Sequence, residues 1–481
     1  MIKYTSTRGG ISPVGFDEAV LQGLADDGGL FVPEIIPTIS AKQLQQWSTL
    51  NYTSLAYEIL SLFVDPQIIP SEELKPLLRE SFSGFEHPAL MPFISFDDNP
   101  HFYIMELFHG PTLSFKDIAM GFLVRTMDYL LKKRNQHLNL ILATTGDTGP
   151  AAANASAGQK TLDCWPLFPA GMISCEQEQQ MTTLKEKNIH PIAVNHCFDG
   201  GDDLDIVVAR MFSDTKRKKE LKLSSVNSIN WCRVMVQTVH YVYGYFRACK
   251  HVGDPVVFSV PSGAFGNLCA GDLARKMGVP ISTFICANNE NRTLHTTFST
   301  GLFKKRDLIE TVSSAIDIVV PYNFWRFLFF NTNSGSAKIS TMMKTFQDKG
   351  EVQLDPETYK SVRNGFKSIA ISDEATLLTI KETFEKYNYL LDPHGAVAVT
   401  AAKLLHQDVV NDVPVVCLAT AHPAKFPTIT RKALGSQNEL PPQGVHHTLE
   451  SAKSLPEKKL TCDLENLELF LSTQIKESLN L

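Results

Sequence analysis

"PVVFSVPSGAFGNLCAGDLARKMG", residues 255 to 278, joins an apolar, β-branched run to a helical pattern through a turn that contains Gly263 and Gly266. A short apolar run that ends in a Gly-rich turn and opens a helix is typical of a βαβ unit. Glycines let a bound group approach the backbone closely, and the N-terminus of the next helix offers free N–H groups and a positive dipole. The stretch therefore predicts a strand, a turn and a helix, with phosphate binding as one interpretation of the turn.

Other interpretations of this turn stay open on local sequence alone. A dinucleotide site would have glycines spaced G-x-G-x-x-G and an acidic residue further on, and Glu290 lies near that place. Here, however, the spacing is G-x-x-G-x-x-x-x-G, and no Lys-Ser or Lys-Thr pair follows as in a P-loop. A purely structural corner between strand and helix explains the pattern as well as a phosphate site does.

The same alternation continues along the chain. LNLILATT (138–145), PISTFICANN (280–289) and VPVVCLATAHP (413–423) are short apolar runs, and each precedes a turn or a helical pattern. They predict an α/β fold with a largely parallel sheet. Apolar residues at helical spacing also occur at 53–64 and 464–475. From these changes of pattern we divide the chain into 1–100, 101–225, 226–435 and 436–481, as an N-terminal subdomain, two parts of a core, and a tail with a docking helix.

Composition narrows the functional class. The 481 residues are 43% hydrophobic and 20% charged, which is ordinary for a globular chain, and the net charge is −6 with scattered Lys and Arg. Nucleic acid is therefore not an expected partner. The nine cysteines form no C-x-x-C pair, which predicts reduced thiols and no metal site. We find no signal peptide and no apolar run of about 18 residues, so we expect a cytoplasmic protein without a membrane partner.

Three further stretches have residue types suited to chemistry. HGPTLSFKD (109–117) places Lys116 at the start of a helical pattern, although a single lysine is usually a solvated surface charge. ATTGDTGPAAA (143–153) offers N–H groups and hydroxyls for a carboxylate, unless Asp147 and Thr148 merely cap the helix. In SSVNSINWCRVMVQ (224–237) the guanidinium of Arg233 suits a phosphate or carboxylate, but a surface helix start explains this stretch equally well.

Taken together and in order, seven stretches resemble the threonine synthase family: YTSTRG (4–9), GLADDGGLFVPEIIP (23–37), HGPTLSFKD (109–117), TTGDTGPA (144–151), NSINWCR (227–233), PSGAFGN (261–267) and ATAHPAKFP (419–427). The resemblance covers nearly the whole chain. It implies the tryptophan-synthase-β-like fold of pyridoxal 5'-phosphate (PLP) enzymes, fold type II, in which two α/β domains with mainly parallel sheets hold the cofactor between them. An N-terminal subdomain is implied as well.

The resemblance also assigns roles to single residues. Lys116 matches the lysine that forms the Schiff base with PLP and acts as the catalytic base, and Thr420 matches the hydroxyl partner of the pyridine nitrogen. Asn227 matches a contact to the cofactor ring, and Arg233 a contact to the substrate phosphate. The cofactor-phosphate loop is Ser262, Gly263, Ala264, Phe265, Gly266 and Asn267, and the loop near the substrate carboxylate is Thr145, Gly146, Asp147 and Thr148.

Within the family the chain is similar to the threonine synthase-like group. This implies a PLP-dependent phospho-lyase that releases phosphate, 2-oxobutyrate and ammonia from O-phosphothreonine or O-phosphohomoserine. The alternatives are a threonine synthase, which adds water after phosphate leaves, and a non-catalytic binding protein on the same fold. Three residues depart from many relatives, namely Tyr322, Trp325 and Gly395, and would alter water access if they line the site. The oligomeric state and the role of the turn at His422 are not predicted.

Overall fold

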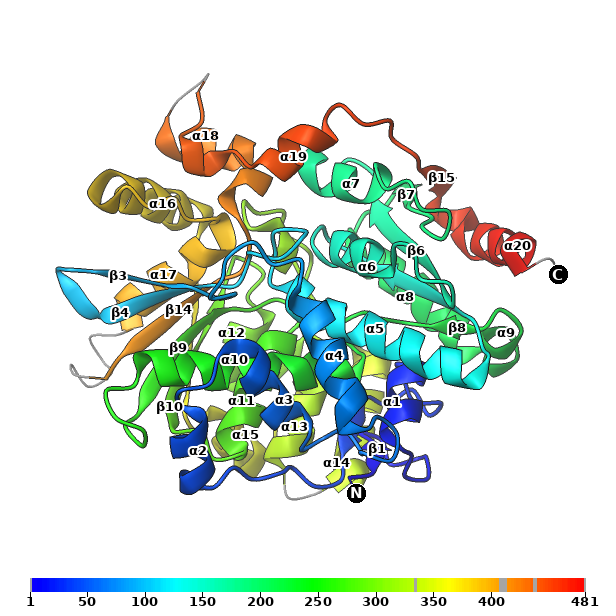
Figure 1. Ribbon diagram of the computed structural model, residues 1–481, viewed down its shortest axis with the longest axis horizontal. Helices are drawn as coiled ribbons and strands as arrows, with labels where there is room; N and C mark the ends of the chain where they lie inside the picture. Colours follow the sequence, from blue (N-terminus) through cyan, green and yellow to red (C-terminus); the bar gives the residue numbers. More distant parts are fainter. Residues whose placement is uncertain (1, 333–334, 406–412, 436–438, 480–481) are drawn as a thin grey trace.

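The computed structural model describes residues 2–332, 335–405, 413–435 and 439–479. Two larger sheets lie side by side with helices on both faces of each (Figure 1). The six-stranded sheet has the order β13-β10-β9-β14-β4-β3, and the five-stranded sheet has the order β15-β7-β6-β5-β8. Two small antiparallel pairs, β1-β2 and β11-β12, are the other strand pairings of the described residues.

The strands of the six-stranded sheet are β3 (Phe93–Phe96), β4 (Asn99–Glu106), β9 (Val256–Pro261), β10 (Ile281–Asn288), β13 (Phe366–Ala370) and β14 (Val415–Ala419). Those of the five-stranded sheet are β5 (Leu138–Ala143), β6 (Leu162–Pro169), β7 (Ile192–Asn195), β8 (Leu223–Ser224) and β15 (Leu460–Asp463). The small pairs are formed by β1 (Tyr4–Ser6), β2 (Phe31–Pro33), β11 (Leu302–Lys304) and β12 (Glu351–Gln353).

Helices α1 to α10 are α1 (Phe16–Gln22), α2 (Ala41–Trp47), α3 (Tyr52–Leu60), α4 (Ser71–Phe82), α5 (Lys116–Arg134), α6 (Thr148–Ser156), α7 (Cys175–Thr182), α8 (Gly201–Ser213), α9 (Thr215–Glu220) and α10 (Trp231–Ala248). The others are α11 (Gly266–Lys276), α12 (Thr293–Thr300), α13 (Asn323–Asn331), α14 (Gly335–Lys349), α15 (Pro356–Arg363), α16 (Asp373–Tyr387), α17 (Pro393–Leu405), α18 (Pro427–Leu434), α19 (His447–Ala452) and α20 (Leu467–Leu479).

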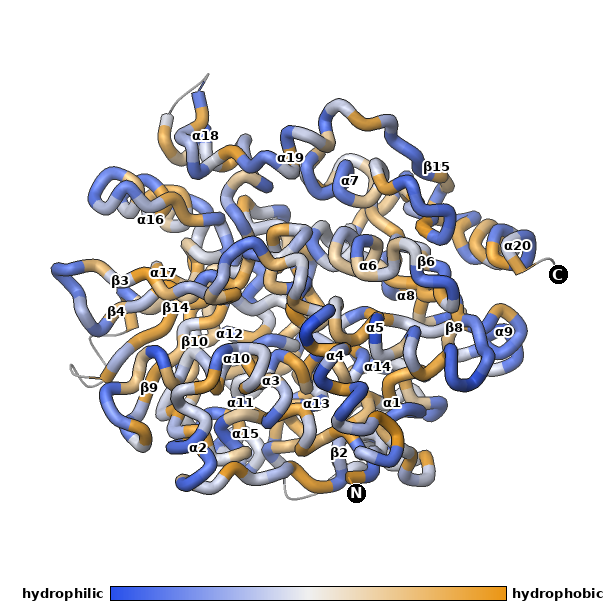
Figure 2. Tube along the Cα trace, in the orientation of Figure 1, coloured by the Kyte–Doolittle hydropathy of each residue, from blue (hydrophilic) through white to orange (hydrophobic). Residues whose placement is uncertain are grey.

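Both large sheets are buried on two faces, as the continuous apolar runs in the sequence predict for parallel strands. Every pairing in the five-stranded sheet is parallel, and in the six-stranded sheet only β3 runs antiparallel to its neighbour. Along β9, Val257 faces α17 while Phe258 and Val260 face α10 and α11. In Figure 2 the tube is orange along much of β14, where the same alternation occurs. The predicted α/β class with mainly parallel sheets is confirmed.

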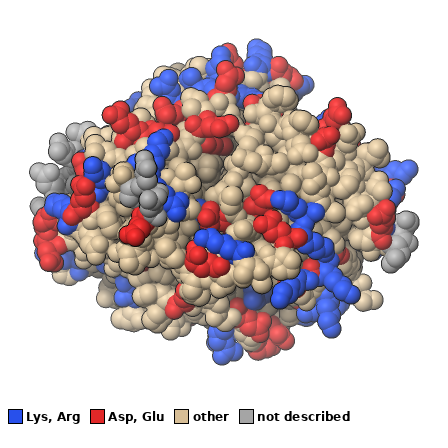
Figure 3. All heavy atoms as spheres, turned by 90° about the horizontal axis from the view of Figure 1, so that it is seen from above, with Lys and Arg blue, Asp and Glu red and all other residues tan. Residues whose placement is uncertain are grey.

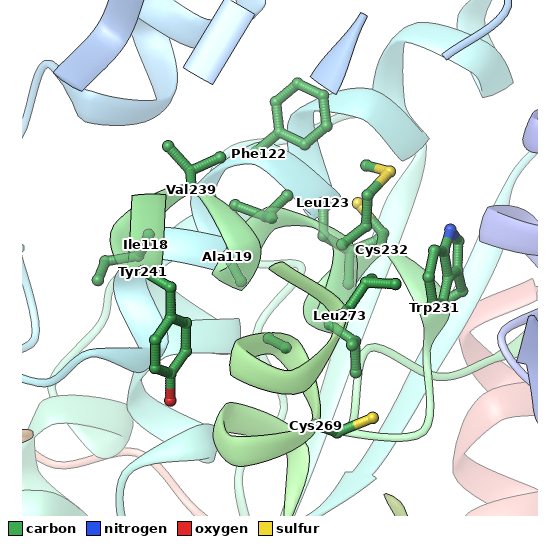
Figure 4. Close-up of a cluster of buried hydrophobic side chains, with 14 of the residues drawn as sticks. Ile118, Ala119, Phe122, Leu123, Trp231, Cys232, Val239, Tyr241, Cys269 and Leu273 are labelled. Carbon is green, nitrogen blue, oxygen red and sulfur yellow. The ribbon is translucent and has the colours of Figure 1, made fainter. Parts of the chain in front are cut away.

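Helices α5, α10 and α11 pack together around one shared apolar core (Figure 4). The cluster includes Ile118 and Phe122 of α5, Trp231 and Val239 of α10, and Leu273 of α11. Large apolar side chains at helical spacing drive this packing, because their burial is worth roughly 1.5–3 kcal/mol each. The arrangement matters for function because Lys116, Arg233 and the turn before Gly266 all lie in the first turn of, or directly before, one of these three helices.

Both ends of the described chain pack against these helices and sheets. Helices α3 and α4, within the first hundred residues, pack against α10 and α5, and the hydroxyl of Tyr4 donates to the carbonyl of Phe63 at 2.9 Å. Near the other end, β15 pairs in parallel with β7, and α20 buries Leu467 and Leu471. In Figure 2, α20 alternates orange and blue in agreement with an amphipathic helix, so the helix expected over 464–475 is present. The domain limits at 100, 225 and 435 stay predictions.

No described helix has the length and apolar character needed to cross a bilayer. On the face seen from above in Figure 3, acidic and basic side chains are interspersed rather than gathered into a broad field of one sign.

Candidate active site

A cavity lies where turns after strands of both large sheets meet. Turns after β5, β9 and β14 supply residues to its wall, as expected for ligand sites at the carboxyl ends of parallel strands. Most of the residues that the sequence singled out are brought together there: Lys116, Thr145, Asp147, Thr148, Asn227, Arg233, Ser262, Gly263, Ala264, Phe265, Gly266, Asn267 and Thr420. Gly146 is outside the lining, and its positive φ of 134° serves the turn instead.

Lys116 is the first residue of α5, and the loop before it is fastened to the end of β14. The backbone N–H of Phe115 donates to the carbonyl of Thr420 at 2.8 Å, and the N–H of His422 donates to the carbonyl of Leu113 at 3.0 Å. Lys116 Nζ donates to Thr148 Oγ1 at 3.2 Å. Burial, followed by the Arg233 guanidinium, lowers the pKa of Lys116 to about 8. A lysine with a lowered pKa is a better nucleophile and base near neutral pH.

The turn after β9 leaves polar atoms without partners. Ser262 Oγ is buried and has no hydrogen-bond partner among the described residues, and the same holds for Asn267 Nδ2. Asn267 is oriented because Tyr241 donates to its Oδ1 at 2.8 Å and His240 Nε2 lies 2.9 Å from the same atom. Buried polar groups normally find partners, so two orphaned donors beside a helix N-terminus indicate a place for an anion.

Backbone geometry explains the glycine in this turn. A Cβ on Gly263 would lie 2.9 Å from the Cα of Ile316, so the wall opposite permits no side chain. Phe265 has a φ of 64° and caps α11 without a side-chain hydrogen bond, which leaves the first N–H groups of the helix to a ligand. Local sequence left three interpretations open, and the orphaned donors favour the phosphate site.

Arg233 is a buried cation without a carboxylate partner among the described residues. It is 2% exposed, and its Nη1 donates to the carbonyl of Val226 at 2.9 Å. Nε has no partner, and no described carboxylate lies within salt-bridge distance of the guanidinium. Burial lowers the pKa of Arg233 to about 10, so it remains charged at neutral pH. An unpaired buried charge is costly, so the cavity is arranged to receive an anion next to Lys116.

Asp147 forms a buried ion pair with Lys425 at 2.7 Å, and both side chains are less than 5% exposed. Gln177 Nε2 also donates to the Asp147 carboxylate, at 2.9 Å. Burial alone would favour the neutral acid, but Lys425 and His394 hold the pKa of Asp147 below its ordinary value. Asp147 accepts no capping bond from α6. The simple helix-cap interpretation is therefore wrong for Asp147.

Thr144 performs that role instead. Its Oγ1 accepts hydrogen bonds from the backbone N–H groups of Gly146 and Gly149, at 3.1 and 2.9 Å. This arrangement satisfies donors at the start of α6, while the hydroxyl of Thr148 accepts from Lys116.

The structure adds lining residues that sequence reasoning missed. Asp205 of α8 accepts a bond from Asn227 Nδ2 at 3.3 Å, and burial, with the neighbouring Asp202, raises its pKa to about 7. His394 also lines the cavity, where its Nε2 accepts from the N–H of Ala315 at 3.1 Å. Neither residue lies in one of the Gly-rich turns after a strand, so no local pattern marked it as a site residue.

The sequence did not identify Lys425 as a site residue, for a different reason. It follows Thr420 by five residues, within a stretch already singled out, but only the fold pairs it with Asp147.

Tyr322, Trp325 and Gly395, which the family resemblance singled out, occupy different places. Tyr322 lines the cavity, and burial and the nearby Asp205 raise the pKa of its hydroxyl. Trp325 lies outside the lining and packs on Phe303 at 5.2 Å between ring centroids. Gly395 is also outside it, and a Cβ there would lie 2.7 Å from a carboxylate oxygen of Asp392.

Comparisons with known proteins agree with this geometry. The family model "Pyridoxal-phosphate dependent enzyme" matches residues 91–421, so the chain is a PLP-dependent enzyme by class. Models described as "Threonine synthase N terminus" and "Threonine synthase, C-terminal" match residues 3–82 and 395–465. The chain belongs to the threonine synthase family.

Relatives and solved structures support the same membership. Threonine synthase of Schizosaccharomyces pombe is 38% identical, over 91% of this chain and 90% of that protein. Threonine synthase-like 2 of Xenopus laevis is 39% identical, over 90% of each chain. The crystal structure of yeast threonine synthase matches with a TM-score of 0.91 at 32% identity, covering 100% of this chain and 99% of that one. PLP-bound threonine synthase from Brucella melitensis matches with a TM-score of 0.89 at 34% identity, covering 99% of this chain and 100% of that one.

The expected PLP cofactor and type II fold are thereby confirmed. The residues present fit PLP, since the cavity combines a lysine of lowered pKa with orphaned donors at a helix N-terminus. Lys116 would hold the cofactor covalently, and the turn from Ser262 to Asn267 would hold its phosphate. When bound, PLP supplies an electron sink for negative charge at the substrate α-carbon.

Proposed function

We propose that this enzyme is a phospho-lyase, which eliminates phosphate from O-phosphothreonine or O-phosphohomoserine and releases 2-oxobutyrate and ammonia. The observation that carries the proposal is the unpaired guanidinium of Arg233 beside Lys116, in the same cavity as the separate anion-binding turn from Ser262 to Asn267. One anion site suits the cofactor phosphate. The second supports a substrate that has an anionic group of its own.

The protein's own residues have distinct tasks in this proposal. Lys116, with its lowered pKa, takes a proton from the substrate carbon once the substrate has displaced it. Arg233 holds the phosphate before and after it leaves, because a planar guanidinium can donate two parallel bonds to it. The N–H groups of Thr145, Asp147 and Thr148 receive the substrate carboxylate, whereas that of Gly146 already donates to Thr144 Oγ1. Asp147 is already paired with Lys425, so it adds no unbalanced negative charge next to that carboxylate.

Tyr322 supports elimination over water addition. Its ring forms part of the cavity wall, and its hydroxyl stays protonated because burial and Asp205 raise its pKa. A bulky ring leaves less room for a water molecule to reach the substrate carbon after phosphate departs. The alternative, threonine synthase, is favoured by the 38% identity with the Schizosaccharomyces pombe protein of that name.

Product analysis distinguishes the two reactions. Purified holoenzyme is incubated separately with O-phosphohomoserine and O-phosphothreonine, and phosphate, threonine and 2-oxobutyrate are quantified. Phosphate and 2-oxobutyrate in equal amounts, without threonine, are the expected result. Threonine formed from O-phosphohomoserine would show that the enzyme is a threonine synthase rather than a phospho-lyase. No phosphate release from either substrate would reject both reactions.

A reducing compartment suits the chemistry of the chain. All nine cysteines are free in the structure. Free thiols persist where glutathione and thioredoxin keep them reduced, which supports our proposal of a cytoplasmic location.

A further inference from the structure

A second cluster of ligand-type side chains lies apart from the residues that line the cavity. It consists of Glu86, in the segment between α4 and β3, and of His446 and His447 at the start of α19. His446 Nε2 lies 3.3 Å from Glu86 Oε2, and His447 Nε2 lies 3.4 Å from Glu86 Oε1. The two histidines thus meet one carboxylate across 360 residues of sequence.

These separations match the edges of a tetrahedral metal site. Zinc binds histidine nitrogen and carboxylate oxygen at about 2.0–2.2 Å, so two ligand atoms of one tetrahedral zinc ion are separated by about 3.3–3.5 Å. The ligand atoms of all three residues lie within 4.8 Å of one another. A set of two histidines and one carboxylate is also a frequent zinc ligand set, with a position left for water.

The charges around the cluster leave a place for a cation. Among the residues that the structure describes, no Lys or Arg lies within salt-bridge distance of Glu86, whose only such partners are the two histidines. His446 turns one of its two ring nitrogens toward the carboxylate. Its Nδ1 accepts from the N–H of Thr448 at 3.3 Å, so Nε2 is the nitrogen directed at Glu86.

More histidines surround the cluster. The ring of His422 lies 5.0 Å from that of His446, and the ring of His87, the residue after Glu86, lies 5.2 Å from that of His109. The N–H of Glu86 donates to the carbonyl of His109 at 2.9 Å. The cluster therefore connects the start of α19 with the loop that leads to Lys116.

We propose that Glu86, His446 and His447 bind one divalent transition-metal ion of the zinc type, which fastens the α19 segment to the loop at His109. Sequence spacing did not indicate it, because the carboxylate and the histidines are brought together only by the fold. The proposal is independent of the reaction at the PLP site.

The test uses the full-length holoenzyme after chelator treatment and dialysis, titrated with Zn²⁺ in a calorimeter and compared in thermal unfolding with and without Zn²⁺. His447→Ala and Glu86→Gln remove one ligand each from exposed positions, with exposed side-chain fractions of 75% and 47%. His251→Ala is the matched control, because His251 is equally exposed and pairs with one carboxylate, Asp254, at 3.2 Å, without a third ligand. Retained visible absorbance of bound PLP verifies that each variant is folded.

We expect one Zn²⁺ per chain and a rise in the unfolding midpoint, with binding weakened at least about tenfold in His447→Ala and Glu86→Gln and unchanged in His251→Ala. Mg²⁺, which prefers oxygen ligands, should not substitute. The absence of stoichiometric Zn²⁺ binding to the wild type would overturn the proposal. Equal Zn²⁺ affinity in the wild type and both ligand variants would also overturn it, since the ion would then be held elsewhere, for example by cysteines.

Discussion

Lys116 Nζ donates a hydrogen bond to Thr148 Oγ1 across 3.2 Å, and this contact joins the first residue of α5 to the first residue of α6. The two helices also pack side by side. The amine that we expect to hold the cofactor is thus positioned against the loop that we expect to bind the substrate carboxylate. The relation depends on the fold, because 32 residues separate the two side chains.

The lowered pKa of Lys116 predicts how cofactor uptake depends on pH. Only the neutral amine attacks the PLP aldehyde, and burial with Arg233 lowers the pKa to about 8 from the ordinary value of 10.5. The rate of PLP uptake by apoenzyme should therefore rise with pH and reach half its maximum near pH 8. The initial growth of visible absorbance after mixing measures this rate. A midpoint at the ordinary lysine value would contradict the proposed environment of Lys116.

Ser262→Ala should weaken PLP binding without unfolding the protein. The hydroxyl has no partner in the described structure, so its removal costs little until an anionic phosphate is there to bond. A hydrogen bond to a charged group is worth about 1.5–3 kcal/mol, which corresponds to a loss of roughly ten- to a hundredfold in affinity. Equilibrium titration of apoenzyme with PLP measures the effect.

Ser156→Ala is the control for Ser262→Ala. Ser156 Oγ is likewise buried and unpartnered among the described residues, but it lies outside the cavity lining. Its loss should leave PLP affinity unchanged. Equal affinities of the two variants for PLP would show that Ser262 does not contact the phosphate.

Arg233→Gln should raise KM for phosphorylated substrates far more than it weakens PLP binding. The guanidinium forms no ion pair with a described carboxylate and lies beside Lys116 in the cavity. In the proposed reaction, its anionic partner is therefore the phosphate of the substrate. We expect an increase in KM of at least about tenfold, the size of a lost charged hydrogen bond. Arg233→Lys keeps the positive charge, so its KM should lie between those of the wild type and Arg233→Gln. Parallel losses in substrate and PLP affinity would assign Arg233 a structural role instead.

The Asp147–Lys425 pair should contribute to stability as a unit. Lys425→Met leaves a buried carboxylate without its cation, and such a change costs about 3–5 kcal/mol of unfolding free energy. Asp147→Asn combined with Lys425→Met should lose less than the sum of the two single variants. Denaturant unfolding of the apoenzymes gives these values. Strict additivity would mean that the two side chains do not interact in solution.

Much of the fold could be predicted from the sequence, because apolar β-branched runs such as the one before Ser262 end in turns that open helices. Lys116 could not be distinguished from a surface lysine until ordered motifs were compared with a known family. Two kinds of residue escaped. Asp205 and His394 lie within or at the start of helices, with no motif, and reach the cavity only through tertiary packing.

Local sequence also does not show which side chains contact one another in the folded protein. Asp147 looked like a helix cap, and Thr144 has that role because Lys425 draws the carboxylate inward. Glu86 and His447 are far apart in the chain, so no short motif with the spacing of metal ligands marks them.

Borohydride reduction of the holoenzyme, followed by peptide mass spectrometry, tests the central assignment most directly. Reduction fixes PLP to the lysine that holds it, and the cavity region offers two candidates: the half-buried Lys116 in the lining, and the buried Lys425, which is paired with Asp147. We predict that the modified peptide contains Lys116 and that Lys116→Ala protein shows no modification. PLP fixed to Lys425, or to another lysine in the wild type, would contradict the account.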